Sequence, residues 1–222
     1  MKMNIKTVFL IIILLIVNFN IKAEPIFVMI NPAGHAKDVG RKLVEDYERS
    51  TAFKMAEVLK EKLQDEYGLR CVLTRYPGEE IVDLQNASFA NRLGVDFYLD
   101  LRLFRQDIVK PKIFIYHLVY NPMVDLASRV FDPYKFISVG QSHFLNISNT
   151  QSYGRKIKDI LTQEYYKKSF DCLGLFGIPI KPLVGLIAPA ICIEIGICEQ
   201  DQWQSLIDPI VKSLNFLSRD KL

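Results

Sequence analysis

The stretch Ile26-Phe-Val-Met-Ile30, followed directly by Asn31-Pro-Ala-Gly-His35, decides how the chain is organised. Five consecutive apolar residues bounded by turn-forming residues are typical of a buried strand. The loop that follows places glycine and histidine at the carboxyl end of that strand, where α/β proteins bind their ligands. We therefore expect an α/β protein with a functional site at this loop.

The rest of the chain repeats the alternation of buried strands and amphipathic helices. Apolar runs predict strands, and apolar residues at three- and four-residue spacing predict helices between them. The predicted strands are 71–74, 97–101, 113–119 and 190–195, and the predicted helices are 51–67, 84–93, 151–166 and 202–217. Ser50 is expected to cap the first helix, and Gly68 is expected to end it. The segment 120–149 is expected to be a long surface excursion, because Pro and Gly interrupt it.

Residues 1–23 are typical of a secretory signal peptide, with basic residues, an apolar run over 8–17 and the small residue Ala23 at the end. The run is shorter than the roughly 20 residues of a bilayer span. We expect cleavage near Glu24, export to the periplasm or beyond, and one domain over 24–222. An uncleaved membrane anchor is the alternative, because Ile21 is bulky for a cleavage site.

Composition argues against nucleic-acid binding. The chain has 28 basic and 25 acidic residues, and three of the basic ones lie in the signal segment, so the mature chain is balanced. Its four cysteines show no recognisable metal spacing. Cys71 and Cys192 lie at or within apolar runs and are expected to be small buried hydrophobes.

Three residues are candidates for chemistry. His35 follows the first strand and is well placed to bind a metal or to act as a base. Glu48 stands just ahead of the first predicted helix. Glu194 lies in an apolar strand, on the face opposite its isoleucine neighbours, so its carboxylate must be paired, bound to a metal or shifted in pKa. A core salt bridge is the structural alternative for Glu194.

These residues and their surroundings resemble the zinc-dependent N-acetylmuramoyl-L-alanine amidases of the AmiC-like catalytic type. The motifs, in chain order, are Asn31-Pro-Ala-Gly-His35, Glu48 before a helix, Leu73-Thr74-Arg75, Ala90-Asn91 and Pro189-Ala-Ile-Cys-Ile-Glu-Ile-Gly196. The resemblance covers nearly the whole mature chain. It implies a single domain in which a twisted, mostly parallel sheet is flanked by helices.

The resemblance also implies a zinc site, but with one ligand replaced. In that family a histidine in the glycine-histidine loop, a glutamate before the first helix and a strand-ending histidine hold one zinc ion. His35 and Glu48 match the first two ligands, and Glu194 matches the catalytic base. The third ligand falls on Arg102, whose guanidinium offers no lone pair and cannot bind zinc. Asp100 shares the strand face of Arg102 and is expected to pair with it.

Other positions also depart from the family. Asn31 stands where aspartate is usual, and Asn86-Ala87 replaces an arginine ahead of Ala90-Asn91. The remaining histidines, His117 and His143, are candidates for a substitute third ligand.

Two functions are implied. One is zinc-dependent hydrolysis of the amide bond between N-acetylmuramic acid and L-alanine in peptidoglycan, with Glu194 transferring the proton. The other is a non-catalytic pseudoamidase that binds peptidoglycan fragments or a protein partner, with Arg102 in place of zinc between Glu48 and Glu194. Membrane contact is expected only through an uncleaved signal segment. The sequence does not indicate an oligomeric state.

Overall fold

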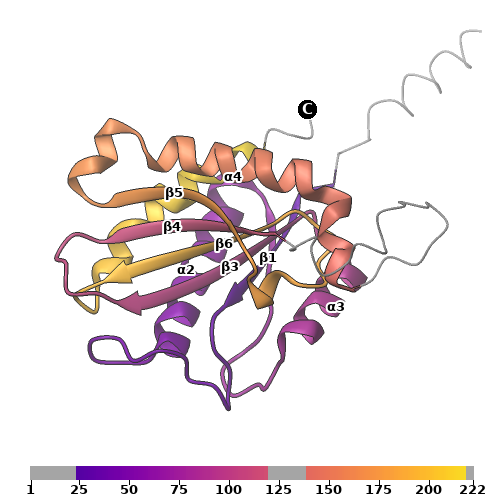
Figure 1. Cartoon of the computed structure of the whole chain (residues 1–222), viewed down its shortest axis with the longest axis horizontal. Helices are drawn as coiled ribbons and strands as arrows, with labels where there is room; N and C mark the ends of the chain where they lie inside the picture. The colour runs from indigo at the N-terminus through magenta and orange to yellow at the C-terminus, as the bar shows by residue number, and fades with distance from the viewer. Residues whose placement is uncertain (1–23, 120–138, 219–222) are drawn as a thin grey trace, which may run out of the picture.

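The computed structural model describes residues 24–119 and 139–218, so the predicted signal segment and residues 120–138 of the predicted excursion lie outside it. The described residues form a six-stranded sheet in the order β2-β1-β3-β6-β4-β5 (Figure 1). The strands are β1 (Phe27–Pro32), β2 (Arg70–Leu73), β3 (Phe97–Arg105), β4 (Lys112–Leu118), β5 (Asp171–Ile178) and β6 (Ala190–Ile197). The α/β class predicted from the sequence is confirmed.

The sheet is mostly parallel, as expected. β1 pairs in parallel with β2 and β3, and β3 pairs in parallel with β6. β4 pairs antiparallel with β6, and β5 pairs in parallel with β4. The connection between β3 and β4 spans only residues 106–111. It is too short for a crossover helix, so β4 returns in the opposite direction.

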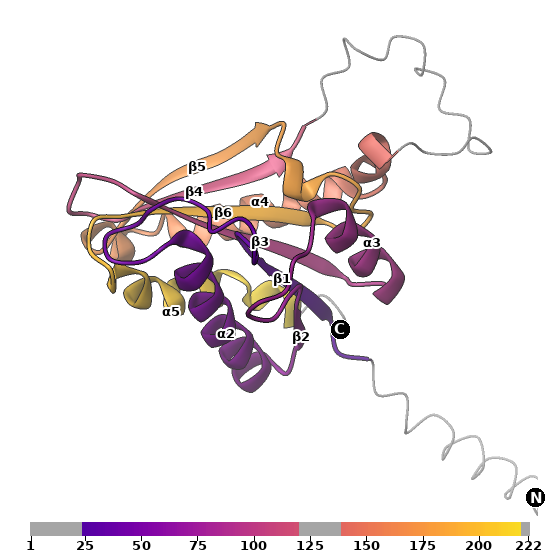
Figure 2. The same ribbon diagram turned by 90° about the horizontal axis from the view of Figure 1, so that it is seen from below.

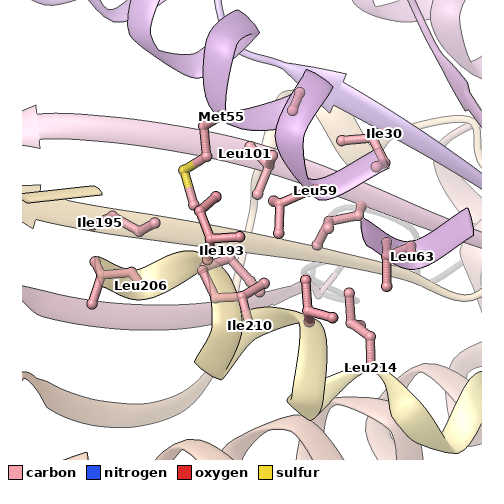
Figure 3. Close-up of a cluster of buried hydrophobic side chains, with 14 of the residues drawn as sticks. Ile30, Met55, Leu59, Leu63, Leu101, Ile193, Ile195, Leu206, Ile210 and Leu214 are labelled. Atoms are coloured by element: carbon pink, nitrogen blue, oxygen red, sulfur yellow. The ribbon is translucent and has the colours of Figure 1, made fainter. Parts of the chain in front are cut away.

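One face of the sheet is covered by three helices, α2 (Glu48–Tyr67), α4 (Ile147–Leu161) and α5 (Ile207–Ser213). Figure 2 shows α2 and α5 together on this side. Their apolar side chains close over the isoleucines of β6, and Figure 3 shows Met55, Leu59 and Ile210 gathered around Ile193. Burial of such side chains supplies the main stabilisation of the fold.

The second face is covered only in part by the described elements. The helix α3 (Asp83–Leu93) and the short helix η5 (Lys181–Leu183) pack over Tyr98 and Cys192. Towards the carboxyl ends of β3 and β6, the same face carries Glu194 and aromatic side chains that are partly exposed. In Figure 1 this face of the sheet is turned to the viewer, and α2 lies behind the strands. This arrangement leaves functional side chains accessible on an otherwise well-packed sheet.

Several predicted boundaries are corrected by the structure. The first long helix begins at Glu48 rather than Thr51, and Ser50 does not cap it, because its hydroxyl bonds instead to Asp46. Gly68 ends the helix with a left-handed φ of 63°, as predicted. The helix predicted over 151–166 is α4, which starts at Ile147, followed by the short helix η4 (Glu164–Lys168).

The end of the chain also differs from the prediction. The helix predicted over 202–217 is divided into η6 (Gln202–Leu206), α5 and η7 (Asn215–Ser218). Pro209 explains the first break, because proline fits only in the first turn of a helix. In the described ranges no helix is both long and apolar enough to cross a bilayer. The four cysteines are free thiols, and Cys71 and Cys192 are buried, as expected.

Candidate functional site

The loop after β1 positions the candidate residues by means of two glycines. Gly34 has a φ of +77°, and a Cβ there would lie 2.8 Å from Cβ of Arg49. Gly40 has a φ of +71°, and a Cβ there would lie 2.8 Å from Oε2 of Glu48. Both positions therefore favour glycine. The close approach at Gly40 lets the next residue, Arg41, turn its backbone and side chain towards Glu48.

The carboxylate of Glu48 is fully engaged by the protein. Its side chain is only 4% exposed. Oε2 accepts hydrogen bonds from the backbone N–H and Nε of Arg41, each at 3.1 Å. Oε1 accepts from Nη2 of Arg41 at 2.9 Å and from the backbone N–H of Leu103 at 3.0 Å. Glu48 also begins α2, where a negative charge is favoured by the helix dipole.

Arg41 joins Glu48 to Glu194. Its Nη1 donates to Oε1 of Glu194 at 2.8 Å, and the hydroxyl of Tyr116 donates to Oε2 of Glu194 at 3.2 Å. Burial acts to lower the pKa of Arg41, but the two carboxylates outweigh it and raise the pKa overall. The structure thus places a guanidinium between the two glutamates that the sequence singled out.

Arg41 is a site residue that was not predicted from the sequence. A loop arginine carries no periodicity, so no pattern marks it. The available signal was electrostatic, because two carboxylates that are largely removed from water require a nearby cation. Arg41 is seven residues before Glu48, in the loop between the two candidate ligands His35 and Glu48, and was a natural supplier of that charge.

Arg102 has a different partner from the one expected in the pseudoamidase interpretation. Its Nε donates to Oδ2 of Asp100 at 2.8 Å, and Asp100 is completely buried. Burial acts to lower the pKa of Arg102, but the charge of Asp100 raises it overall. The predicted pairing with Asp100 is confirmed. The expectation that Arg102 bridges Glu48 and Glu194 is wrong, because Arg41 holds that place and Arg102 is anchored two residues along its own strand.

The departures at Asn31 and Asn86 belong to one polar network around Asp100. Nδ2 of Asn31 donates to Oδ1 of Asp100 at 2.6 Å. Oδ1 of Asn31 accepts from Oγ1 of Thr74 at 2.7 Å and from Nδ2 of Asn86 at 3.0 Å. A carboxylate at position 31 would offer no donor to Asp100. The amide at this position and the Arg102–Asp100 pair are therefore mutually consistent.

A pocket of about 200 Å³ opens beside this network, lined by His35, Glu48 and Arg102 among others. Glu194 is outside its lining and is linked to it through Arg41. Asp83 also lines the pocket, and its pKa is raised by burial and by the charge of Asp100. The structure thus brings His35 and Glu48 into one pocket and places Glu194 next to it.

The substitute ligands do not reach this pocket. His117 lies near the carboxyl end of β4, which is antiparallel to β6. It follows Tyr116, the partner of Cys192, and is therefore farther than Glu194 from the carboxyl end of β6. It also points to the opposite face from Tyr116. His143 is buried. Burial lowers the pKa of His143, and the neighbouring His117 lowers it further. Neither histidine therefore completes a site with His35 and Glu48.

The residues present do not fit a catalytic zinc site. Such sites use three protein ligands. Among the described residues, no group of three or more His, Cys, Asp or Glu side chains comes together to hold a metal ion. Both oxygens of Glu48 are occupied by N–H donors, and the cation of Arg41 lies where a metal would need to approach the glutamates.

Comparisons with known proteins identify the fold. No protein-family model matches the sequence, and no curated protein matches it. An N-acetylmuramoyl-L-alanine amidase from Clostridium difficile 630 is similar in structure, with a TM-score of 0.65 and 17% identity over 90% of this chain and 100% of that chain.

Two further amidases give the same result. The catalytic domain of CwlV from Paenibacillus polymyxa matches with a TM-score of 0.62 and 14% identity over 86% of this chain and 97% of that chain. AmiC2 of Nostoc punctiforme matches with a TM-score of 0.61 and 13% identity over 87% of this chain and 98% of that chain. The chain therefore has the fold of the N-acetylmuramoyl-L-alanine amidase catalytic domains.

Proposed function

We propose that this chain is an exported cell-wall protein that binds peptidoglycan at the junction of the glycan and the stem peptide, without cleaving it by zinc catalysis. The observation that carries the proposal is the guanidinium of Arg41 between Glu48 and Glu194. Arg102 supports it, because it stands where the resemblance expects the third zinc ligand. The amidase fold and the signal-like N-terminus support the cell wall as the place of action.

The chemistry of the guanidinium explains why binding without cleavage is favoured. Arg41 satisfies both carboxylates through a rigid fork of N–H donors, as a cation must in this position. It has no vacant coordination position, so it cannot generate a metal-bound nucleophile. The guanidinium holds the two carboxylates together, but it does not provide a metal to activate water. A polar pocket with fixed donors and acceptors remains available for a ligand.

A zinc-dependent amidase is the second candidate function, and one observation favours it. The side chain of Arg41 is 42% exposed and belongs to a loop, so it can move away from the glutamates. His35 and Glu48 then offer two ligands in one pocket, next to Glu194. This function requires a third ligand from the substrate, from water or from a rearranged side chain.

A sedimentation and release experiment separates the two functions. Purified mature protein is mixed with peptidoglycan sacculi, with and without added zinc, and both cosedimentation and newly freed L-alanine amino groups are measured. We expect cosedimentation and no release in either condition. Zinc-dependent release that is lost in Glu194→Gln would establish the amidase. Failure to cosediment, with no release, would reject both functions.

A further inference from the structure

A row of four aromatic rings crosses the open part of the sheet beside the site. The ring centroids of Phe104 and Phe114 are 6.0 Å apart, those of Phe114 and Tyr116 are 6.1 Å apart, and those of Tyr116 and Phe176 are 6.1 Å apart. The residues come from β3, β4 and β5. Together they form a continuous surface, which we call the aromatic row.

Two glycines lie beside the ends of the aromatic row. A Cβ on Gly196 of β6 would lie 2.7 Å from Cζ of Phe104, so a side chain at this position would displace the ring. Gly174 of β5 has a φ of +129°, and a Cβ there would lie 3.6 Å from Cζ of Phe176. Gly196 therefore allows the close approach of the Phe104 ring to β6, whereas the contact at Gly174 is of ordinary length.

The aromatic row is accessible in the described structure. Phe176 is 42% exposed, and the other three rings are partly buried. Aromatic side chains contribute large stabilising areas when buried, so a contiguous set that stays partly exposed points to a ligand.

The aromatic row is continuous with the candidate site. The hydroxyl of Tyr116 donates to Glu194, and Cζ of Arg41 lies 5.6 Å from the ring centroid of Phe104. A ligand that covers the row therefore meets a carboxylate and a guanidinium at its edge. The two glutamates outweigh the single charge of Arg41, so this cluster carries a net negative charge and does not suit an anionic ligand.

We propose that the aromatic row binds the sugar rings of the glycan strand, while the pocket at Glu48 receives the neighbouring part of the same ligand. Sugar rings present C–H groups with partial positive charge, which are attracted to the negative faces of aromatic rings. Their hydroxyl and acetamido groups match donors and acceptors such as Arg41 and Glu194. A nucleic-acid strand needs a cationic groove for its phosphates, and the carboxylate of Glu194 beside Tyr116 would repel them. This inference rests on the proposed function and names part of its ligand.

The test uses a tetramer of β-1,4-linked N-acetylglucosamine, a glycan without stem peptide, titrated into the full mature protein by calorimetry. Phe176→Ala is expected to weaken binding about threefold to tenfold, as for the loss of one aromatic contact. Phe176→Leu keeps apolar volume without the ring and is expected to behave in the same way. Tyr165→Ala is the matched control, because Tyr165 is 82% exposed on η4, outside the row.

The outcomes distinguish this inference from the proposed function. If the wild-type protein sediments with sacculi but does not bind the tetramer, or if the Phe176 variants bind it as well as wild type does, the aromatic row is not the glycan site. If the tetramer binds through the row but sacculi do not, the row is a sugar site and the proposed function is wrong. Concentration-dependent dimerisation abolished by Phe176→Ala would instead assign the row to contact between copies and overturn the inference.

Discussion

Arg41 shows how one side chain can substitute for the electrostatic role of a metal. The carboxylate of Glu48 is almost fully buried, and an unpaired charge in such a place is strongly unfavourable. Arg41 stabilises it with three hydrogen bonds and also binds Glu194. A guanidinium stabilises the folded site in this way, but it does not provide Lewis-acid chemistry. Arg41 can therefore take over the stabilising role of a metal ion but not its catalytic role.

Removing Arg41 should destabilise the protein measurably. Arg41→Met leaves Glu48 buried with only two backbone N–H donors, those of residue 41 and Leu103, and with no cation beside it. We expect a loss of about 1–3 kcal/mol in the free energy of unfolding. The partial exposure of Arg41 keeps this figure below that of a fully buried pair. Urea unfolding measures it, with Lys37→Met as control, because Lys37 pairs only at the surface, where its side chain is 74% exposed. Equal stability of the two variants would show that Arg41 does not stabilise the site.

Tyr116 gives a pH-dependent signature of its contact with Glu194. Burial raises its pKa to about 12, and the charge of Glu194 adds to the shift. An unfolded tyrosine ionises near pH 10. The folded form therefore holds its proton longer, and the stability that this provides is complete below about pH 10 and is lost as the pH rises towards 12.

The measurement is tyrosinate absorbance against pH for the wild type and for Tyr116→Phe. The difference between the two curves should titrate well above pH 10. A difference curve centred near the ordinary tyrosine value would mean that the phenol is not held against Glu194 in solution.

Strands and helices differ in how clearly the sequence predicts them. β1, β3 and β6 are buried and apolar throughout, so simple apolar runs identify them. β5 was missed, because it is an edge strand with half-exposed residues, two glycines and neither a continuous apolar run nor regular alternation. Its role becomes visible only in the sheet, where it carries Phe176 at the end of the aromatic row.

A single methyl group in β6 should test the packing of the aromatic row. Gly196→Ala places a Cβ against the ring of Phe104 and against Oε1 of Gln106, which would lie 2.6 Å away. Both are ends of side chains that can shift, so we expect the protein to fold and the ring to move. Affinity for the N-acetylglucosamine tetramer should fall at least twofold, as one aromatic contact is disturbed. Gly196 has no positive φ, so the substitution adds no backbone strain of that kind, and its effect comes from the contacts of the new Cβ.

For the chain as a whole, the sequence predicted most residues of the site but not which charged side chains pair with one another. His35, Glu48 and Glu194 were predicted to meet in one pocket, because strand ends and helix starts meet at the carboxyl edge of a parallel sheet. His35 and Glu48 line one pocket, and Glu194 lies outside its lining and is joined to Glu48 by Arg41. The partner of each charged group depends on distances between loops and strands, which sequence spacing does not specify. This is why the pairing of Arg102 within its own strand was predicted and the bridging role of Arg41 was not.

The N-terminal segment leads to a prediction about where the protein is found. We expect the mature chain to begin near Glu24 and to be recovered beyond the inner membrane, because residues 1–23 combine basic residues with a short apolar run. N-terminal sequencing of the protein from fractionated cells is the measurement. Intact Met1 on protein from the cytosol would contradict export and remove the access to peptidoglycan that the proposed function requires.

The central claim is that arginine takes the place of zinc at this site, and a zinc titration of the wild type beside Arg41→Ser/Arg102→His tests it most directly. The double variant removes the cation between the glutamates and supplies an imidazole at the position of the third ligand. We expect it to bind one zinc ion at least about a hundredfold more tightly than the wild type, because it has one more ligand and two fewer positive charges near the site. Stoichiometric binding of zinc by the wild type, with an affinity equal to that of the double variant, would contradict the claim.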